Sequence, residues 1–155
     1  GEAESQGLEI DLNGEIADGL SLWASYTYID TETKNDFFDA NFGRTVPAGS
    51  PLLNVPEQQL SLQLVKQMQL AGKPLELGGG VLYVGERNGY FGVNFDLPSY
   101  TTARLFTAYQ LTETISLRAE VDNVFGKEYY SNSFADVWVQ PGTPRSMRVS
   151  AAFRF

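Results

Sequence analysis

Histidine and cysteine are both absent from this sequence of 155 residues. Without histidine, the chain itself cannot hold a Ser-His-Asp triad, a histidine zinc site or a histidine general base. The lack of cysteine says little about the compartment, because proteins of several compartments do without disulfides. We therefore expect no catalytic residue, no metal site and no resident cofactor, and we expect that the chain is not an enzyme.

Positive charge and long apolar runs are also scarce. Lys and Arg together number 11 against 19 Asp and Glu, which gives a formal net charge of −8. This balance argues against a nucleic-acid partner, since such partners need clustered cations. No run of about 18 apolar residues is present, which excludes a transmembrane helix. The first residues lack the basic and apolar regions of a signal peptide, so we expect that the sequence begins within something larger.

Apolar and polar residues alternate with a period of two, which is typical of β-strands. The alternating runs lie at residues 7–16, 20–28, 60–64, 75–83, 100–111, 115–121 and 145–155. Between them we expect tight turns at 17–19 and 112–114, a medium turn at 66–74, and long connections at 31–53, 88–98 and 131–142. These features predict an all-β, antiparallel up-and-down meander of about seven strands with nearest-neighbour pairing. Three consecutive glycines at 78–80 predict the close approach of another element.

The polar side of these strands carries full charges at strand centres, at Asp11, Arg118, Glu120 and Arg148. Such charges are hard to place in the dry core of a sandwich, whereas a barrel with lipid outside and water inside explains both faces. Short periplasmic turns and long extracellular loops also fit a barrel. In such a barrel the outward-facing aromatic residues lie at both ends of the strands, where they form the aromatic girdles at the two membrane interfaces. These residues are Tyr26, Tyr28 and Tyr83 at the loop end and Tyr109, Phe153 and Phe155 at the turn end.

Five segments, in order along the chain, resemble motifs of the TonB-dependent receptors. They are Asn-Val-Pro-Glu-Gln-Gln-Leu at residues 54–60, Tyr-Val-Gly-Glu-Arg at 83–87, Leu-Pro-Ser-Tyr-Thr at 97–101, Asp-Asn-Val-Phe-Gly-Lys-Glu-Tyr-Tyr at 122–130 and Pro-Gly-Thr-Pro-Arg at 141–145. Together these five motif segments cover nearly the whole chain and are specific, although each alone is weak. The departures are small, because Gly126 stands where Asp is usual and Asp122 where Asn is usual.

The resemblance implies the outer membrane of a Gram-negative bacterium and a transmembrane barrel of about 22 strands with an N-terminal plug. Such receptors import ferric siderophores with energy relayed by TonB. By that count, residues 1–155 are the C-terminal segment of the barrel, without the plug and the earlier strands, and alone are not competent for transport. The expected partners are a ferric siderophore as transported ligand, the TonB complex acting through the plug, the barrel-assembly machinery and outer-membrane lipid.

Two groups of residues are candidates for function. Val149, Phe153 and Phe155 alternate along the last strand and resemble the C-terminal signal that the barrel-assembly machinery reads. Aromatic and arginine side chains in the long connections suit a bulky anionic iron chelate, although packing between loops would also explain them. These ligand candidates are Phe37, Phe38, Arg44, Tyr90, Phe91, Phe134 and Trp138, with Phe42 and Phe95 in the same connections.

Other functions stay open. A soluble β-sandwich that binds a ligand with its aromatic loops would need its mid-strand charges buried. A TonB-dependent receptor for haem or cobalamin is a further alternative, although the absence of histidine disfavours haem. An outer-membrane barrel enzyme would need a base to activate its nucleophile, and without histidine this sequence offers no plausible one. If the chain is part of a larger barrel, its first and last strands are free edges, and the isolated chain is expected to self-associate.

Overall fold

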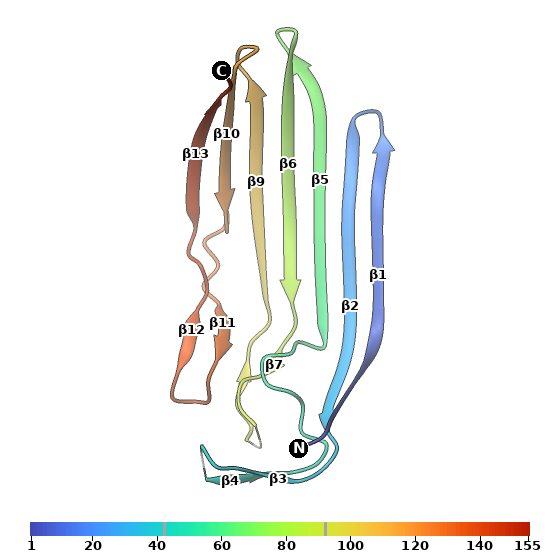
Figure 1. Ribbon diagram of the computed structural model, residues 1–155, viewed down its shortest axis with the longest axis vertical. Helices are drawn as coiled ribbons and strands as arrows, with labels where there is room; N and C mark the ends of the chain where they lie inside the picture. Colours follow the sequence, from blue (N-terminus) through green and yellow to red (C-terminus); the bar gives the residue numbers. More distant parts are fainter. Residues whose placement is uncertain (42, 92) are drawn as a thin grey trace.

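The computed structural model describes residues 1–41, 43–91 and 93–155, and it places most of them in one antiparallel sheet. The sheet has seven strands in the order β1-β2-β5-β6-β9-β10-β13 (Figure 1). Their bounds are Ala3–Ala17, Leu20–Thr33, Gln58–Leu70, Lys73–Val84, Tyr100–Gln110, Ile115–Asp122 and Ser146–Phe153. Consecutive strands of the sheet pair with one another, so the predicted all-β meander is confirmed. None of the described residues belongs to a helix of the length and apolarity that a membrane span requires.

Each long connection contains a small hairpin of its own. β3 (Phe37–Asp39) pairs with β4 (Arg44–Val46), β7 (Arg87–Asn88) with β8 (Asp96–Leu97), and β11 (Tyr130–Ser133) with β12 (Val139–Pro141). All three long connections lie at one end of the sheet, and the short turns lie at the other (Figure 1). This asymmetry between the two ends agrees with the predicted alternation of short and long connections.

The strands β5 and β6 correct the expectation of a medium turn at residues 66–74. Apolar alternation continues through Met68 and Leu70, so β5 runs to Leu70 and β6 starts at Lys73. The turn has two residues, Ala71 and Gly72, with φ of 52° and 73°. Positive φ at both positions is what a two-residue hairpin turn of type I′ requires.

The register places most apolar side chains of the seven strands on one face, although Trp23, Val65 and Phe106 lie on the other. Leu60 pairs with both Tyr26 and Tyr83, and Leu62 pairs with Ala24 and Val81. The prediction that the even residues of 20–28 share a face with Leu60, Leu62 and Leu64 is therefore confirmed. Large members of this apolar face are exposed in the chain as it stands: Leu8, Leu12, Leu64, Leu105, Met147 and Val149.

The most deeply buried side chains lie at the loop end and not in the sheet. Val46, Tyr90, Leu97 and Ala135 are at most 2 % exposed, and each lies in or beside one of the small hairpins. A single sheet has no second layer against which to bury either face, whereas the three connections pack on one another. The connections therefore form the packed core of this chain.

Candidate functional site

The first and second connections meet through aromatic and cation–π contacts. The rings of Phe37 and Phe91 are 6.0 Å apart in an edge-to-face arrangement. The guanidinium of Arg44 lies 4.4 Å from the centre of the Tyr90 ring. Burial raises the pKa of the Tyr90 phenol, and the neighbouring Arg44 opposes this shift. The structure thus brings together Phe37, Arg44, Tyr90 and Phe91, four of the predicted ligand residues.

The other predicted ligand residues are on the surface of the connections. Phe38 is 66 % exposed, Phe134 54 % and Trp138 56 %. The backbone N–H of Phe134 donates to the carbonyl of Trp138 (2.9 Å), which closes the hairpin tip that carries both rings. These three side chains are accessible to a ligand, whereas the Tyr90 ring is covered. Phe42 lies outside the described residues.

A contact between the first and third connections was not foreseen from the sequence. The side-chain amide of Asn54 donates from Nδ2 to the carbonyl of Ser133 (2.8 Å), and its Oδ1 accepts from the N–H of Ser133 (2.9 Å). The backbone N–H of Asn54 donates to the carbonyl of Asn88 (2.8 Å) in the second connection. The Ser133 hydroxyl donates to the carbonyl of Gly89 (2.6 Å). Asn54 and Ser133 therefore join all three connections.

Arg87 makes a second junction between the second and third connections. Its Nη2 donates to the carbonyls of Tyr130 and Ser131, the latter at 3.0 Å. The guanidinium lies 5.4 Å from the centre of the Tyr100 ring, which in turn stacks on Tyr129 at 4.1 Å. Arg87 is 4 % exposed, and burial lowers the pKa of its guanidinium.

The turn after β10 is closed by the buried side chain of Asn123. Its Nδ2 donates to the carbonyls of Lys127 (2.8 Å) and Thr143 (3.1 Å), and its Oδ1 accepts from the N–H of Lys127 (2.8 Å). Gly126, within this turn, has φ of 65°, a left-handed conformation that glycine adopts without strain. The departure from Asp to Gly at this position therefore fits the local backbone.

The five motif segments all contribute to these junctions. Segment 54–60 supplies Asn54, segment 83–87 supplies Arg87, and segment 97–101 supplies Tyr100. Segment 122–130 supplies Asn123 and Tyr129. Segment 141–145 supplies Gly142, where a β-carbon would overlap the ring of Tyr129. The residues that carry the family resemblance are thus the residues that join the loops to one another and to the sheet.

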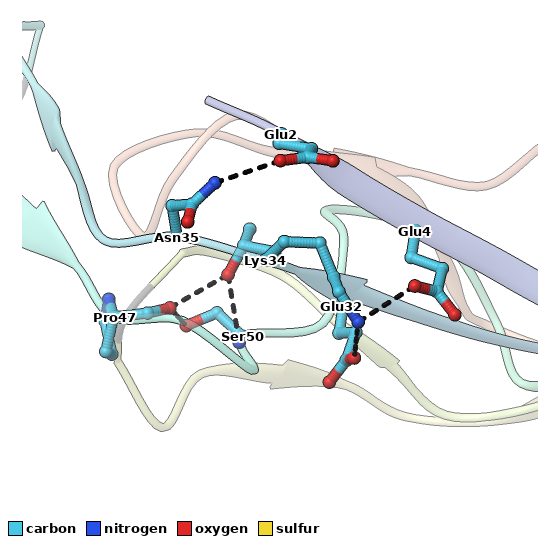
Figure 2. A network of polar contacts seen from close by, with 8 residues as sticks. Glu2, Glu4, Glu32, Lys34, Asn35, Pro47 and Ser50 are labelled. Carbon is cyan, nitrogen blue, oxygen red and sulfur yellow. Dashed lines mark hydrogen bonds and ion pairs between the residues drawn. The ribbon is translucent and has the colours of Figure 1, made fainter.

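The first connection is also tied to the start of β1. Lys34 bridges the carboxylates of Glu4 (2.8 Å) and Glu32 (2.9 Å), and Asn35 donates to Glu2 (3.2 Å), as Figure 2 shows. The hydrogen bond with Glu4, followed by the one with Glu32, raises the pKa of the Lys34 ammonium above its ordinary value. These ionic contacts hold the N-terminal strand against the connection that follows β2.

The first connection folds back on the end of β2 through Thr33. The Thr33 hydroxyl donates to the carbonyl of Pro47 (2.9 Å) and accepts from the N–H of Ser50 (3.1 Å). The Ser50 hydroxyl also donates to Pro47 (2.7 Å) (Figure 2). Thr33 and Ser50 are buried, so these bonds satisfy polar groups that water does not reach.

The polar face of the last three strands carries a cluster of charged residues. Arg104 and Arg118 lie on the Phe106 ring, at 5.1 and 5.0 Å from its centre. Glu120 bridges Arg118 (3.3 Å) and Arg148 (2.7 Å). A hollow of about 480 Å³ opens beside them, lined by Gln63, Arg104, Asp122, Tyr129 and Arg148 among others. Within residues 1–41, 43–91 and 93–155, no cluster of acidic side chains is arranged to hold a metal ion.

The candidate assembly residues lie at the edge of the sheet. Val149 and Phe153 project from the apolar face of β13, opposite Ala119 and Ile115 of β10. They are 71 % and 60 % exposed, and Phe155 is fully exposed. The regular strand ends at Phe153, two residues earlier than expected, although the N–H of Arg154 still donates to the carbonyl of Thr114 (2.9 Å).

Comparisons with known proteins agree with this architecture. The metal-pseudopaline receptor CntO of Pseudomonas aeruginosa is 37 % identical over 159 aligned residues, which cover 100 % of this chain and 21 % of that protein. The crystal structure of the siderophore receptor PiuA from Acinetobacter baumannii superposes with a TM-score of 0.83 at 24 % identity, over 97 % of this chain and 22 % of that one. The crystal structure of the ferripyoverdine receptor of P. aeruginosa, bound to ferripyoverdine, superposes with a TM-score of 0.74 at 27 % identity. The superposition covers 97 % of this chain and 19 % of that one.

The chain thus spans about a fifth of the length of the relatives that it matches. The family model described as TonB dependent receptor-like, beta-barrel matches residues 1–124, which is most of the sequence. Proteins of this family are outer-membrane β-barrels of Gram-negative bacteria, and its members named above are receptors, not enzymes. The chain belongs to the TonB-dependent receptor β-barrel family.

Proposed function

We propose that this chain is a wall segment of an outer-membrane receptor that imports ferric siderophores with energy relayed by TonB. The observation that carries the proposal is its similarity over its full length to receptors whose names specify metal-chelate or siderophore ligands. The segment alone has no transport activity, because transport requires a closed wall. The receptor has no resident cofactor, and the iron chelate is its cargo.

The two faces of the sheet support this placement. The apolar face, with Leu62, Leu105 and Val149, faces lipid, since it is exposed on every strand and free of a packing partner in the sheet. The polar face, with Arg118, Glu120 and Arg148, faces the aqueous lumen, where charged side chains remain hydrated. A soluble β-sandwich would bury one of these faces, and within residues 1–41, 43–91 and 93–155 no second sheet packs on the seven-stranded sheet.

The loop end is the proposed ligand-binding end. Arg44 supplies a cation for an anionic chelate, and the exposed rings of Phe38, Phe134 and Trp138 supply flat apolar surface. Phe37 and Phe91 support this surface through their edge-to-face contact. Tyr90, being covered, contributes by holding Arg44 in place.

A second candidate ligand is a metal chelate of another kind. The relative named as a metal-pseudopaline receptor is 37 % identical, whereas the relative named as a ferripyoverdine receptor is 28 % identical. Identity of this order favours a small metal chelate over haem or cobalamin.

Uptake by the full-length receptor tests the proposal. The receptor is expressed in a Gram-negative strain that lacks its own siderophore receptors, and uptake of radioactive iron is measured with a panel of ferric siderophores. Metal–pseudopaline, haem and cobalamin are tested in parallel, and a strain without TonB is the control. We expect TonB-dependent uptake of at least one ferric siderophore. Uptake of metal–pseudopaline alone favours the second candidate, and uptake of haem or cobalamin alone rejects both.

A further inference from the structure

The structure assigns to Asn54, Arg87 and Ser133 a positioning role: together they hold the three long connections as one rigid ligand-binding surface. We call these three residues the loop lock. This inference rests on the proposed function, because it concerns how ligand-contacting side chains are held and not which ligand they bind. None of the three is proposed to contact ligand, since Arg87 and Ser133 are each 4 % exposed.

The side-chain amide of Asn54 makes the hydrogen bonds that a backbone peptide group would make in a β-sheet. Its side-chain amide pairs with both the N–H and the carbonyl of Ser133, at 2.9 and 2.8 Å, in the way that two β-strand residues pair. The two residues are 79 positions apart in the sequence. Asn54 has φ of 60°, a left-handed conformation that asparagine adopts more readily than most residues. Both its side chain and its backbone are therefore committed to this contact.

Ser133 extends the lock to the second connection. Its hydroxyl donates to the carbonyl of Gly89 at 2.6 Å, and the N–H of Asn54 donates to the carbonyl of the adjacent Asn88. One short segment of the second connection thus receives bonds from both of the others. Displacement of any one connection would break hydrogen bonds to the remaining two, so the three move together.

Arg87 fixes the base of the hairpin formed by β11 and β12. Its Nη2 donates to the carbonyls of Tyr130 and Ser131, where β11 begins. Its other terminal nitrogen, Nη1, is buried and has no hydrogen-bond partner in the part of the chain that the structure describes. A buried guanidinium is costly unless it is hydrogen-bonded, and here the carbonyls of Tyr130 and Ser131 and the ring of Tyr100 are its contacts. Holding the hairpin in place gives this arrangement a function.

The lock sets the distance between side chains that contact the ligand. Phe38 and Arg44 belong to the first connection, whereas Phe134 and Trp138 belong to the third. β3 and β4 form one small sheet and β11 and β12 another, and among the described residues no strand links the two. With the lock closed, these residues are ordered before ligand arrives, so binding does not have to order them.

The test uses the full-length receptor in detergent, with Asn54→Gly as the main variant. Glycine keeps the positive φ and removes the amide, so the variant reports on the hydrogen bonds and not on backbone strain. Asn94→Gly is the matched control, because Asn94 is an exposed asparagine of the neighbouring connection. Amide hydrogen exchange of residues 130–141 is measured without ligand, and the affinity for the transported chelate is measured separately.

We expect Asn54→Gly to speed exchange in residues 130–141 and to weaken binding by about tenfold, as the loss of two such bonds implies. The fraction of folded barrel in gels should stay that of the wild type. Unchanged exchange, or faster exchange with unchanged affinity, overturns the inference while leaving the proposed function intact. A wild-type receptor that binds no chelate rejects the proposed function, and the exchange data still decide whether the lock exists.

A cross-link separates positioning from general destabilisation. In a cysteine-free receptor, Asn54→Cys and Ser133→Cys together replace the hydrogen bonds by a disulfide that can be reduced. We expect the oxidised form to bind like the wild type and the reduced form like Asn54→Gly. Equal affinities of the two forms would overturn the positioning role.

Discussion

The aromatic ring of Phe106 lies over Gly78, its cross-strand partner, in the space that a β-carbon at position 78 would occupy. The guanidinium groups of Arg104 and Arg118 lie 5.1 and 5.0 Å from the centre of this ring. Gly78 is thus required by its neighbour and not by a turn. The absence of a side chain at Gly78 leaves the space that the Phe106 ring occupies in the charged cluster of the polar face.

The first prediction concerns Gly78→Ala in the full-length receptor. Because Phe106 cannot shift without disturbing two arginines, we expect a loss of about 1–3 kcal/mol in barrel stability, as overpacking costs. Gly79→Ala is the matched control: its β-carbon would meet the flexible end of Leu105 at 3.0 Å and the Arg104 carbonyl oxygen at 3.5 Å, which is an ordinary contact distance. Thermal unfolding followed by gel mobility compares the two variants. Equal stabilities would show that the ring moves freely.

The second prediction concerns the end of the chain. Phe155→Ala should lower the amount of receptor in the outer membrane far more than it lowers ligand affinity, because Phe155 is fully exposed and lies outside the loop end. Heat-modifiability in gels reports assembly, and binding to cells normalised for receptor number reports affinity. Normal assembly with lost binding would reverse the assignment of Phe155, Phe153 and Val149 as an assembly signal.

The third prediction concerns an exposed ring of the third connection. Trp138→Ala should weaken binding of the transported chelate several-fold to about thirty-fold, since an exposed aromatic contributes about 1–2 kcal/mol. Barrel assembly should not change. Val137→Ala is the control, because Val137 is an exposed side chain of the same hairpin and carries no aromatic ring. If substitution of Phe38, Phe134 and Trp138 in turn leaves affinity unchanged, these rings serve loop packing alone.

The fourth prediction is a pH dependence at Lys34. Its pKa is raised in the folded state, so the contact with Glu4 and Glu32 stabilises the fold fully below the ordinary lysine pKa. This stabilisation is lost as the pH rises through the higher folded pKa. NMR of ¹³C-methylated lysines, with Lys34→Arg to assign the signal, measures the titration directly. High salt should reduce the shift, because the ion pairs are exposed. A signal that titrates at the ordinary lysine value would contradict the contact.

The fifth prediction concerns residues 1–155 as an isolated chain. β1 and β13 are both edges of the sheet, with unpaired backbone groups, and the apolar face is bare. Such surfaces associate in water. Light scattering should show large species without detergent and small ones with it. A stable monomer at tens of micromolar without detergent would favour the sandwich alternative.

The sequence alone was enough to predict the sheet. A period of two fixes which side chains share a face, and turn residues mark where each strand ends, so the meander and its two faces follow from local pattern. Strand lengths were less predictable. Gly72 and Pro74 indicate a turn within residues 66–74, but the sequence does not show that the turn has only two residues, because the pairing of Leu70 with Lys73 decides where β5 ends.

The loop end depended on tertiary structure. The sequence predicted that Tyr90 and Trp138 lie in loops, but it could not show that one ring is buried and the other exposed. Nor does any local pattern join Asn54 to Ser133, because hydrogen bonds between residues 79 positions apart depend on where the sheet brings the loops. The sequence showed which residues match the family motifs. Only the fold showed why these residue types are needed, because it places them in contact with one another.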